Sequence, residues 1–230
     1  PEKHIMCFDP MTGKRGIAKT REVEGKTQVY MQLKSGESII LQTFTRSLQG
    51  EPEWKYRKEM DYSLSLDHGW KLRFVESYPA IEGEFKIDTP SSWTEIAHPA
   101  AKINRGTALY SLELDLPELS ADDWVLDLGD VRESARVRIN GQEAGIAWAA
   151  PFRLSIGQLL KSGKNLIEVE VTNLPANSIA EMDRQGKQWR IFEDINMAKL
   201  NYEKGTYGHW ETLPSGLNGI VRLIPVKYLF

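Results

Sequence analysis

Residues 135–148 read ARVRINGQEAGIAW, and this stretch decides the fold class. Apolar and polar residues alternate through Ala135, Val137 and Ile139, which is the period-two pattern of a strand with one buried face. Asn140 and Gly141 then supply the two positive-φ positions of a tight hairpin turn. The stretch therefore predicts a β-hairpin. It leaves open whether Trp148, at the end of the hairpin, packs as scaffold or contacts a ligand.

The same alternation recurs through most of the chain, with turn signals at intervals of roughly 8 to 12 residues. The matching segments are WKLRFV, GEFKID, ALYSLELDL, WVLDLG, FRLSI and LIEVEVTN. Many short strands at this spacing are typical of an antiparallel β-sandwich or jelly roll. We predict an all-β jelly roll with Trp70, Trp93 and Trp124 in its core, and no helix of ordinary length before residue 176.

The first 45 residues predict strands of a different unit. HIMCF is a strand with Cys7 buried, and TQVYMQLKSGESIILQTF predicts a hairpin that turns at residues 34–37. Three or four strands are too few for an independent core. We therefore predict three parts: terminal strands of an adjoining β-sandwich module at 1–45, a linker at 46–53, and the jelly roll at 54–230. Because the chain starts in mid-strand without Met, we expect a fragment whose export signal belongs to a missing N-terminal part.

Composition excludes several classes of protein. The chain has 230 residues, with 29 basic and 32 acidic side chains and a net charge of −3. No run of like charges stands out, so we expect no nucleic-acid partner. No apolar run reaches the length of a membrane span. A single cysteine excludes an intramolecular disulfide. No motif supports nucleophilic, phosphoryl-transfer or hydride chemistry, and the four histidines lack metal-ligand spacing.

The segment from Ala176 to Trp210 departs from the strand pattern. It is polar and aromatic without clean periodicity, and it is too long for a mere connection. Sugars pack their C–H faces on aromatic rings and pair their hydroxyls with polar side chains, so this composition predicts carbohydrate binding. The candidate side chains are Asp183, Arg184, Trp189, Arg190, Asn196, Asn201, Tyr202, Tyr207, His209 and Trp210, with Trp148 from the hairpin. The alternative is that these side chains only pin a long loop onto the sandwich.

Carboxylates in the same segment raise the question of catalysis, because glycoside hydrolysis needs two at a suitable separation. The segment offers Glu181, Asp183, Glu193, Asp194, Glu203 and Glu211. Among 32 acidic residues some such cluster arises by chance. We therefore predict no catalytic residue here and keep an independent hydrolase using carboxylates of 176–211 as an alternative. We expect no cofactor. Jelly rolls often carry structural calcium, but the DxDxDG spacing of a calcium loop is absent.

Three elements together resemble the galactose-binding-like jelly roll known as the sugar-binding domain of family 2 glycoside hydrolases. They are VRINGQEAG at 137–145, the Pro151-Phe152 step, and NLIEVEVTN at 165–173. The tail, MDRQGKQWRIFEDINMAKLNY followed by LPSGLNGIVRL, is similar to the C-terminal end of bacterial α-L-rhamnosidases of glycoside hydrolase family 106. CFDPMTGKRGIAKT and VYMQLKSGESIILQTF also fit that pattern, so the resemblance covers nearly the whole chain.

The resemblance implies that the acid and base carboxylates lie in an N-terminal barrel that this chain lacks, so no catalytic residue carries over. It implies an accessory carbohydrate-binding or structural domain of a secreted bacterial glycoside hydrolase acting on polysaccharide, located in the periplasm or at the cell surface. The implied partners are carbohydrate and the barrel of the same parent chain. The alternative is a bracing module without sugar affinity. Ile220 replaces the proline of the usual S-G-L-x-G-P-V ending, so a different loop geometry is expected there.

Overall fold

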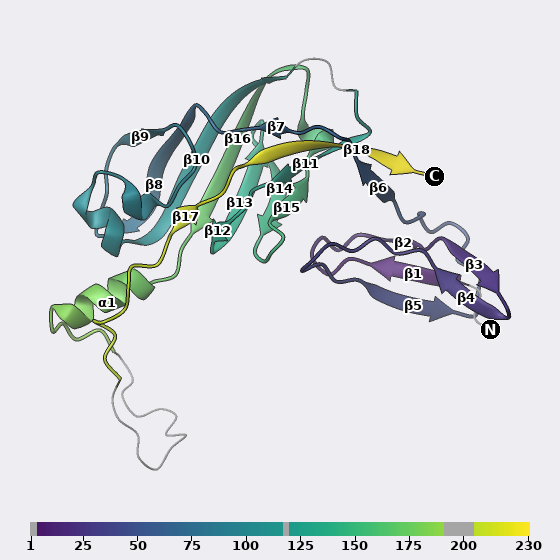
Figure 1. Ribbon diagram of the computed structural model, residues 1–230, viewed down its shortest axis with the longest axis horizontal. Coiled ribbons are helices and arrows are strands. Elements are labelled where there is room, and N and C mark those ends of the chain that lie inside the picture. Colours follow the sequence, from purple (N-terminus) through teal and green to yellow (C-terminus); the bar gives the residue numbers. More distant parts are fainter. Residues whose placement is uncertain (1–3, 117–119, 191–204) are drawn as a thin grey trace, which may run out of the picture.

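The computed structural model describes residues 4–116, 120–190 and 205–230, and almost all of their regular structure is β-strand (Figure 1). A six-stranded antiparallel sheet has the order β14-β13-β16-β10-β8-β9. Its strands are β8 (Trp70–Tyr78), β9 (Glu84–Ile87), β10 (Arg105–Leu116), β13 (Ser134–Ile139), β14 (Gln142–Ala147) and β16 (Gly163–Thr172). Every strand segment predicted for this sheet is present, because the apolar residues of each one alternate toward a common core.

A second sheet has the order β15-β11-β18-β6, with β7 also paired to β18. Its strands are β6 (Tyr56–Glu59), β7 (Leu64–Ser65), β11 (Asp123–Asp127), β15 (Arg153–Ser155) and β18 (Arg222–Leu229). A short pair, β12 (Val131–Arg132) and β17 (Gly216–Leu217), and three 3-10 turns at Trp93–Glu95, Pro99–Ile103 and Gly157–Leu159 complete this part. The two sheets bury one large apolar core that includes Trp70, Trp93 and Trp124. The prediction of an all-β sandwich is confirmed.

The hairpin of residues 135–148 forms as predicted. Asn140 and Gly141 have φ angles of 53° and 78°, as a tight two-residue turn requires. The Asn140 carboxamide donates to the carbonyl of Leu159 and accepts from the amide of Leu166, at 2.9 and 3.0 Å. It thereby ties the hairpin tip to β16. The sequence pattern therefore identified both the turn and the buried face of β13, where Val137 and Ile139 are fully buried.

The N-terminal unit consists of a three-stranded sheet, β2-β1-β5, and a separate hairpin, β3-β4. Its strands are β1 (His4–Phe8), β2 (Arg15–Ile17), β3 (Thr20–Val23), β4 (Lys26–Val29) and β5 (Ile40–Phe44). The predicted hairpin that turns at 34–37 is wrong, because β4 pairs with β3 and β5 pairs with β1. Glu24 and Gly25 have positive φ angles and make the real turn. Within residues 30–37 of this unit, Gln32 and Lys34 instead contact β6.

Residues 46–53, predicted as a linker, make specific contacts with the N-terminal unit. Leu48 is buried, and Ile17 forms a parallel bridge with Glu53. Trp54 packs against a small core that contains Cys7, which is buried as expected. The boundaries at 45 and 54 remain a prediction. In the part of the chain that the structure describes, no helix is both long and apolar enough to cross a membrane.

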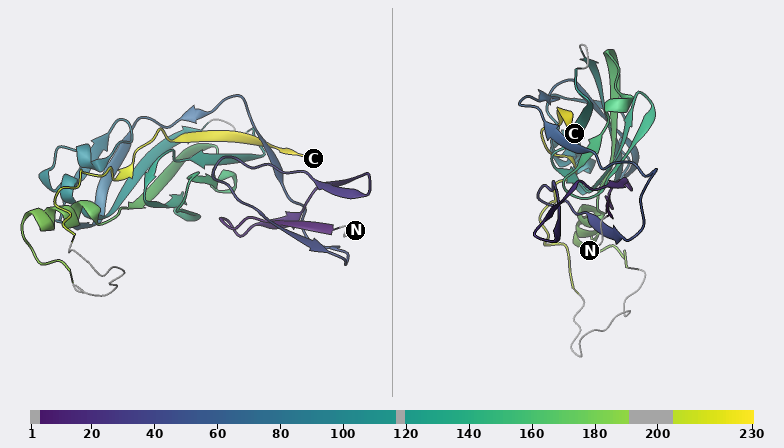
Figure 2. Two further views of the ribbon diagram at one scale, coloured as in Figure 1. Left: turned by 60° about the horizontal axis from the view of Figure 1, so that its bottom comes forward. Right: turned by 90° about the vertical axis from the view of Figure 1, so that its right-hand side faces the viewer.

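One α-helix, α1 (Ala176–Arg184), occurs in the described residues, and it follows β16 directly. Figures 1 and 2 show α1 and the N-terminal strands at opposite ends of the molecule, while both chain termini lie on the side of the N-terminal strands. The candidate sugar-binding segment is therefore remote from the N-terminal unit, and the sandwich separates the two.

Candidate functional site

The candidate site lies at one end of the six-stranded sheet. Ser134 at the start of β13 is opposite Thr172 at the end of β16, and Ala135 is opposite Ala147 at the end of β14. Trp148 therefore leaves the sheet at the same end at which β16 passes into α1. Sequence reasoning treated Trp148 and the 176–210 segment as separate candidates, and the sheet register places them on one side of the fold.

Helix α1 holds the returning chain through a buried asparagine. The Asn177 carboxamide donates to the carbonyl of Leu213 and accepts from its amide, both at 2.8 Å. Asn177 is only 4% exposed, so these two bonds satisfy a side chain that has little access to water. Sequence reasoning missed this residue, because no local pattern marks a partner 36 positions away.

Asp183 is the central acceptor of the site. Its Oδ2 accepts from the backbone amides of Tyr207 and Gly208, at 2.5 and 3.0 Å. Its Oδ1 accepts from the indole N–H of Trp189 at 3.2 Å. The carboxylate thus joins the end of α1 to the segment that returns after residue 204. In this geometry Asp183 positions the aromatic residues around it.

Two arginines secure the same segment. Arg184 donates through Nε to the carbonyl of Gly208 at 2.7 Å and through a terminal nitrogen to the carbonyl of Trp210 at 2.8 Å. Arg190 donates to the carbonyl of Gly205 and lies over the rings of Trp189 and Tyr207, with centroid distances of 4.9 and 5.2 Å. Guanidinium groups stack well on aromatic faces, so Arg190 adds a charge to an aromatic surface.

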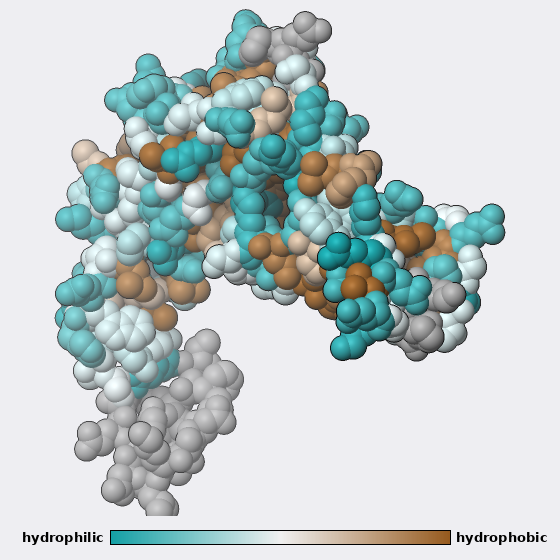
Figure 3. All heavy atoms as spheres, turned by 45° about the vertical axis from the view of Figure 1, so that its right-hand side comes forward, coloured by the Kyte–Doolittle hydropathy of each residue, from teal (hydrophilic) through white to brown (hydrophobic). Residues whose placement is uncertain are grey.

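Three aromatic rings form a continuous cluster. The ring centroids of Trp189 and Tyr207 are 5.6 Å apart, and those of Tyr207 and Trp210 are 4.6 Å apart, with interplanar angles near 50°. Trp210 remains 39% exposed, and its neighbour His209 is exposed as well. Figure 3 shows hydrophilic residues over most of the face in view, with apolar residues in small groups. An aromatic ring that is held by its neighbours and partly open to water, such as that of Trp210, suits the C–H face of a sugar.

The carboxylates of α1 are poorly suited to acid catalysis. Hydrogen bonds from the Tyr207 amide and then the Trp189 indole hold the pKa of Asp183 below its usual value. The side chains of Gln185 and Arg184 likewise lower the pKa of Glu181. A glycosidase acid needs a raised pKa so that it is protonated at the working pH. Neither carboxyl has that property.

Trp148 is the most exposed tryptophan in the described residues, at 59%. Its loop joins β14 to β15, and the N-terminal unit reaches the same loop. A Cβ atom on Gly36 would lie 3.0 Å from the carbonyl oxygen of Ala150, so the two backbones are in close contact there. Trp148 is therefore not a core residue, and its indole face is open to a partner.

Sequence reasoning also missed an exposed aromatic residue at this end of the sheet. Tyr78, at the end of β8, is 53% exposed, and the Arg105 guanidinium lies 4.6 Å from its ring centroid. The signal in the sequence was the Tyr78-Pro79 step, which ends a strand.

Six of the candidate residues predicted from the sequence lie outside the described residues: Glu193, Asp194, Asn196, Asn201, Tyr202 and Glu203.

The loop at residues 215–221 is the ending in which Ile220 stands in place of the usual proline. Asn218 donates its amide to the carbonyl of Asp130 at 2.8 Å, and a Cβ on Gly219 would lie 2.5 Å from the amide nitrogen of Asp130. Backbone contact therefore holds this loop, in which Ile220 is 46% exposed.

The described residues contain no group of three or more His, Cys, Asp or Glu side chains that could hold a metal ion. The sequence left structural calcium open without predicting it.

Known proteins provide an independent comparison. No family model matches the chain. A putative beta-glucuronidase of Formosa agariphila is 29% identical over 197 residues, which are 77% of this chain and 17% of that protein. The rhamnosidase of Novosphingobium sp. PP1Y superposes with a TM-score of 0.74 at 26% identity, over 97% of this chain and 20% of that one.

A beta-glucuronidase of Bifidobacterium dentium, solved with coumarin-3-O-glucuronide, superposes with a TM-score of 0.51 at 18% identity. That match covers 74% of this chain and 31% of the other, and at this identity it shows the fold alone. This chain therefore spans less than a third of the length of each of these three proteins. The matches show that it is related to glycoside hydrolases of the rhamnosidase and glucuronidase kind.

Proposed function

We propose that this chain is a non-catalytic, carbohydrate-binding accessory part of a glycoside hydrolase that acts on polysaccharide, of α-L-rhamnosidase type. The single observation that carries the proposal is the cluster of Trp189, Tyr207 and Trp210, whose rings contact one another while Trp210 stays exposed. Aromatic platforms of this kind bind sugar rings, because the C–H face of the sugar packs on the π-face of the ring.

The chemistry of the cluster favours binding over hydrolysis. Asp183 and Glu181 both have pKa values below their usual range, so they stay ionised at neutral pH. Arg190 lies over two of the rings and keeps a positive charge next to the proposed sugar site. Such a charge attracts acidic groups, while the rings bind neutral parts of a glycan. The catalytic groups of the parent enzyme would then lie in another domain.

The similarity to part of a rhamnosidase supports several finer proposals. We assign the sandwich to the galactose-binding-like jelly rolls and the parent protein to glycoside hydrolase family 106. Residues 1–45 would end an adjoining module, with a linker at 46–53 and the jelly roll at 54–230. A catalytic barrel in the same parent chain would be the neighbour of this part, and the parent would work in the periplasm or at the cell surface of a bacterium.

The test is calorimetric titration of the chain with rhamnose- and galactose-containing oligosaccharides, together with the Trp210→Ala variant. We expect saturable binding that the variant weakens by about tenfold or more, because stacking on one well-placed ring contributes on the order of 1.4 kcal/mol. Trp148→Ala, measured in parallel, reports whether the second exposed indole at this end of the sheet contributes to binding.

The matched control is Tyr62→Ala, because Tyr62 is also exposed, at 46%, but lies before β7 in the other sheet. It should bind sugar like the parent chain. Equal weakening by the control would show that binding is unrelated to the cluster. Failure to bind any oligosaccharide would favour the bracing module, and release of the aglycone from an aryl rhamnoside by the purified chain would refute the non-catalytic assignment.

A further inference from the structure

The outer face of the five-stranded sheet carries an unusual set of charged groups. In β11, Trp124 and Leu126 point into the main core, so the alternating residues Asp123 and Asp127 face outward. The ladder places four more charged side chains on that outer face: Arg57, Glu59, Arg153 and Arg222. The face therefore carries three carboxylates and three guanidinium groups. They surround three nearly buried apolar residues, Val125, Ile224 and Val226.

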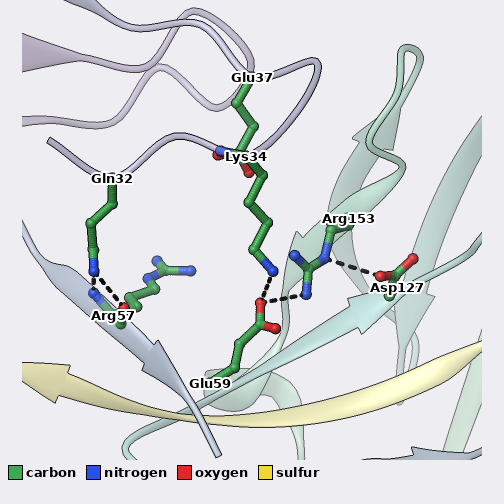
Figure 4. Close-up of polar contacts among 7 residues, drawn as sticks. All are labelled: Gln32, Lys34, Glu37, Arg57, Glu59, Asp127 and Arg153. Atoms are coloured by element: carbon green, nitrogen blue, oxygen red, sulfur yellow. Dashed lines mark hydrogen bonds and ion pairs between the residues drawn. The ribbon is translucent and has the colours of Figure 1, made fainter.

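Lys34, in residues 30–37 of the N-terminal unit, adds a further cation to this face. Lys34 bonds through its ammonium group to Oε1 of Glu59, and the same oxygen accepts from Arg153 at 2.8 Å (Figure 4). Arg153 in turn pairs with Asp127 at 3.2 Å and is only 12% exposed. Glu59 therefore lies between two cations, one from each unit. If its charge were removed, the two cations would lose their shared partner.

The same segment also caps the edge of the sheet. β6 is an edge strand, and the Gln32 carboxamide donates to the carbonyl of Arg57 and accepts from its amide, both at 2.8 Å. A side chain thus makes the two bonds that a further strand would make at this residue. Edge strands are commonly protected by such coverings. Figure 4 shows the side chains of Gln32 and Lys34 reaching toward the sheet from one irregular segment.

Other charged groups face this interface and define its electrostatics. Arg57 lies 3.7 Å from Asp123, and Glu37 accepts from the amide of Lys34. Lys14, on the turn between β1 and β2, has a lowered pKa because of burial and the nearby Arg57. Burial raises the pKa of Glu59, but hydrogen bonds from Lys34 and Arg153 outweigh it, so that the net shift is downward. Every one of these charges has an opposite charge or a hydrogen-bond donor or acceptor nearby.

We propose that Gln32, Lys34, Glu59 and Arg153 form a latch that fixes the N-terminal strands against the five-stranded sheet, with Glu59 as its positioning residue. The latch makes the N-terminal unit and the sandwich move as one rigid body. It also braces the loop that carries Trp148, because Gly36 of the same segment contacts Ala150. The latch, and not the predicted linker at 46–53, then sets the angle between the two units.

The first readout is hydrogen exchange at the Arg57 amide, which the latch itself protects through Gln32. We expect Glu59→Gln to accelerate this exchange by about tenfold, since charged hydrogen bonds are the stronger ones. Gln32→Ala removes the acceptor and should accelerate it at least as much. Glu113→Gln, which changes an exposed glutamate of β10 in the other sheet, is the matched control and should leave it unchanged. Unchanged exchange at Tyr110 in the core of every variant shows that the sandwich stays folded.

The second readout is the distance between spin labels at Glu22→Cys and Lys164→Cys, one in each unit. Cys7 can stay in place, because burial raises its pKa and keeps the thiol unreactive toward labels. We expect one narrow distance distribution that Glu59→Gln and Lys34→Gln each broaden, with little further effect when they are combined. A narrow distribution in Glu59→Gln with slow Arg57 exchange would overturn the proposal, and so would a broad distribution in the unmutated chain.

Discussion

Replacing Gly216 with alanine should destabilise the protein by about 2–5 kcal/mol. Gly216 has a φ of 96°, and a Cβ there would lie 2.2 Å from Oη of Tyr110 and 2.8 Å from the ring of Trp93. The left-handed backbone costs an L-residue about 1–2 kcal/mol, and overpacking a close-packed core adds about 1–3 kcal/mol. Both rings are fully buried, so neither can move aside into solvent.

Gly25 is the matched control for backbone strain without overpacking. Its φ is 72°, but no heavy atom lies within 4 Å of a Cβ built there. Gly25→Ala should therefore cost only the backbone term, about 1–2 kcal/mol. Chemical denaturation of both variants, read by far-UV circular dichroism, measures the difference in the free energy of unfolding. Equal costs at the two sites would refute the argument from packing.

A second substitution separates the two contacts at Gly216. Tyr110→Phe removes the oxygen nearest to the new methyl group but also removes the acceptor of the Leu217 amide, which donates to Tyr110 at 3.2 Å. The single change should destabilise the chain, whereas the double variant should be more stable than the sum of the two single effects predicts. Strict additivity would mean that the hydroxyl of Tyr110 is not what the alanine methyl meets.

Three further predictions concern the polar contacts. Asn177→Ala should cost about 1–3 kcal/mol, because it removes both hydrogen bonds between the buried Asn177 carboxamide and the backbone of Leu213, and the denaturation midpoint measures this. Asp183→Asn should speed hydrogen exchange at the Tyr207 and Gly208 amides, and unchanged exchange would contradict the role of Asp183 as an anchor. The folded-state pKa of Glu59 is lowered, so its stabilising contribution is complete above the ordinary value near 4.5 and disappears as the pH falls through the lower folded value. The stability difference between the parent chain and Glu59→Gln should accordingly shrink between pH 7 and pH 3.

The sequence predicts the sandwich well because its strands follow a local rule. Alternation is strict in β13 and in the buried part of β16, and β10 departs from it where residues 108–110 are all buried; each strand has one face in the main core. The N-terminal unit fails this rule, since β5 carries Ile40 and Leu41 on opposite faces and both stay exposed. The sequence analysis predicted the turn at 34–37, whereas Glu24 and Gly25 make it in the structure. Gln32 instead bonds to β6, 25 positions away, a contact that no local pattern in the sequence marks.

In the candidate site, too, the local sequence predicts which residues gather, whereas contacts between distant residues determine what each one does. Composition alone placed aromatic and charged side chains in one segment, and six of the predicted residues do contact one another. Their individual roles depended on partners far along the chain. Asp183 and Arg184 bond to the backbone of residues 207–210, a contact that no spacing rule describes.

This division of roles bears directly on the proposed function. The carboxylate oxygens of Asp183 accept hydrogen bonds from two backbone amides and one indole N–H. Asp183 would therefore affect a ligand indirectly, by holding Tyr207 and Trp189 in position. The exposed face of the Trp210 indole, by contrast, does not hold another part of the chain in position. Loss of sugar affinity in Asp183→Asn should therefore appear together with faster exchange in residues 207–208, whereas Trp210→Ala should weaken binding at unchanged exchange. Only a binding surface held in place by Asp183 produces both results, because a loop that merely braced the sandwich would respond to Asp183→Asn and have no affinity to lose.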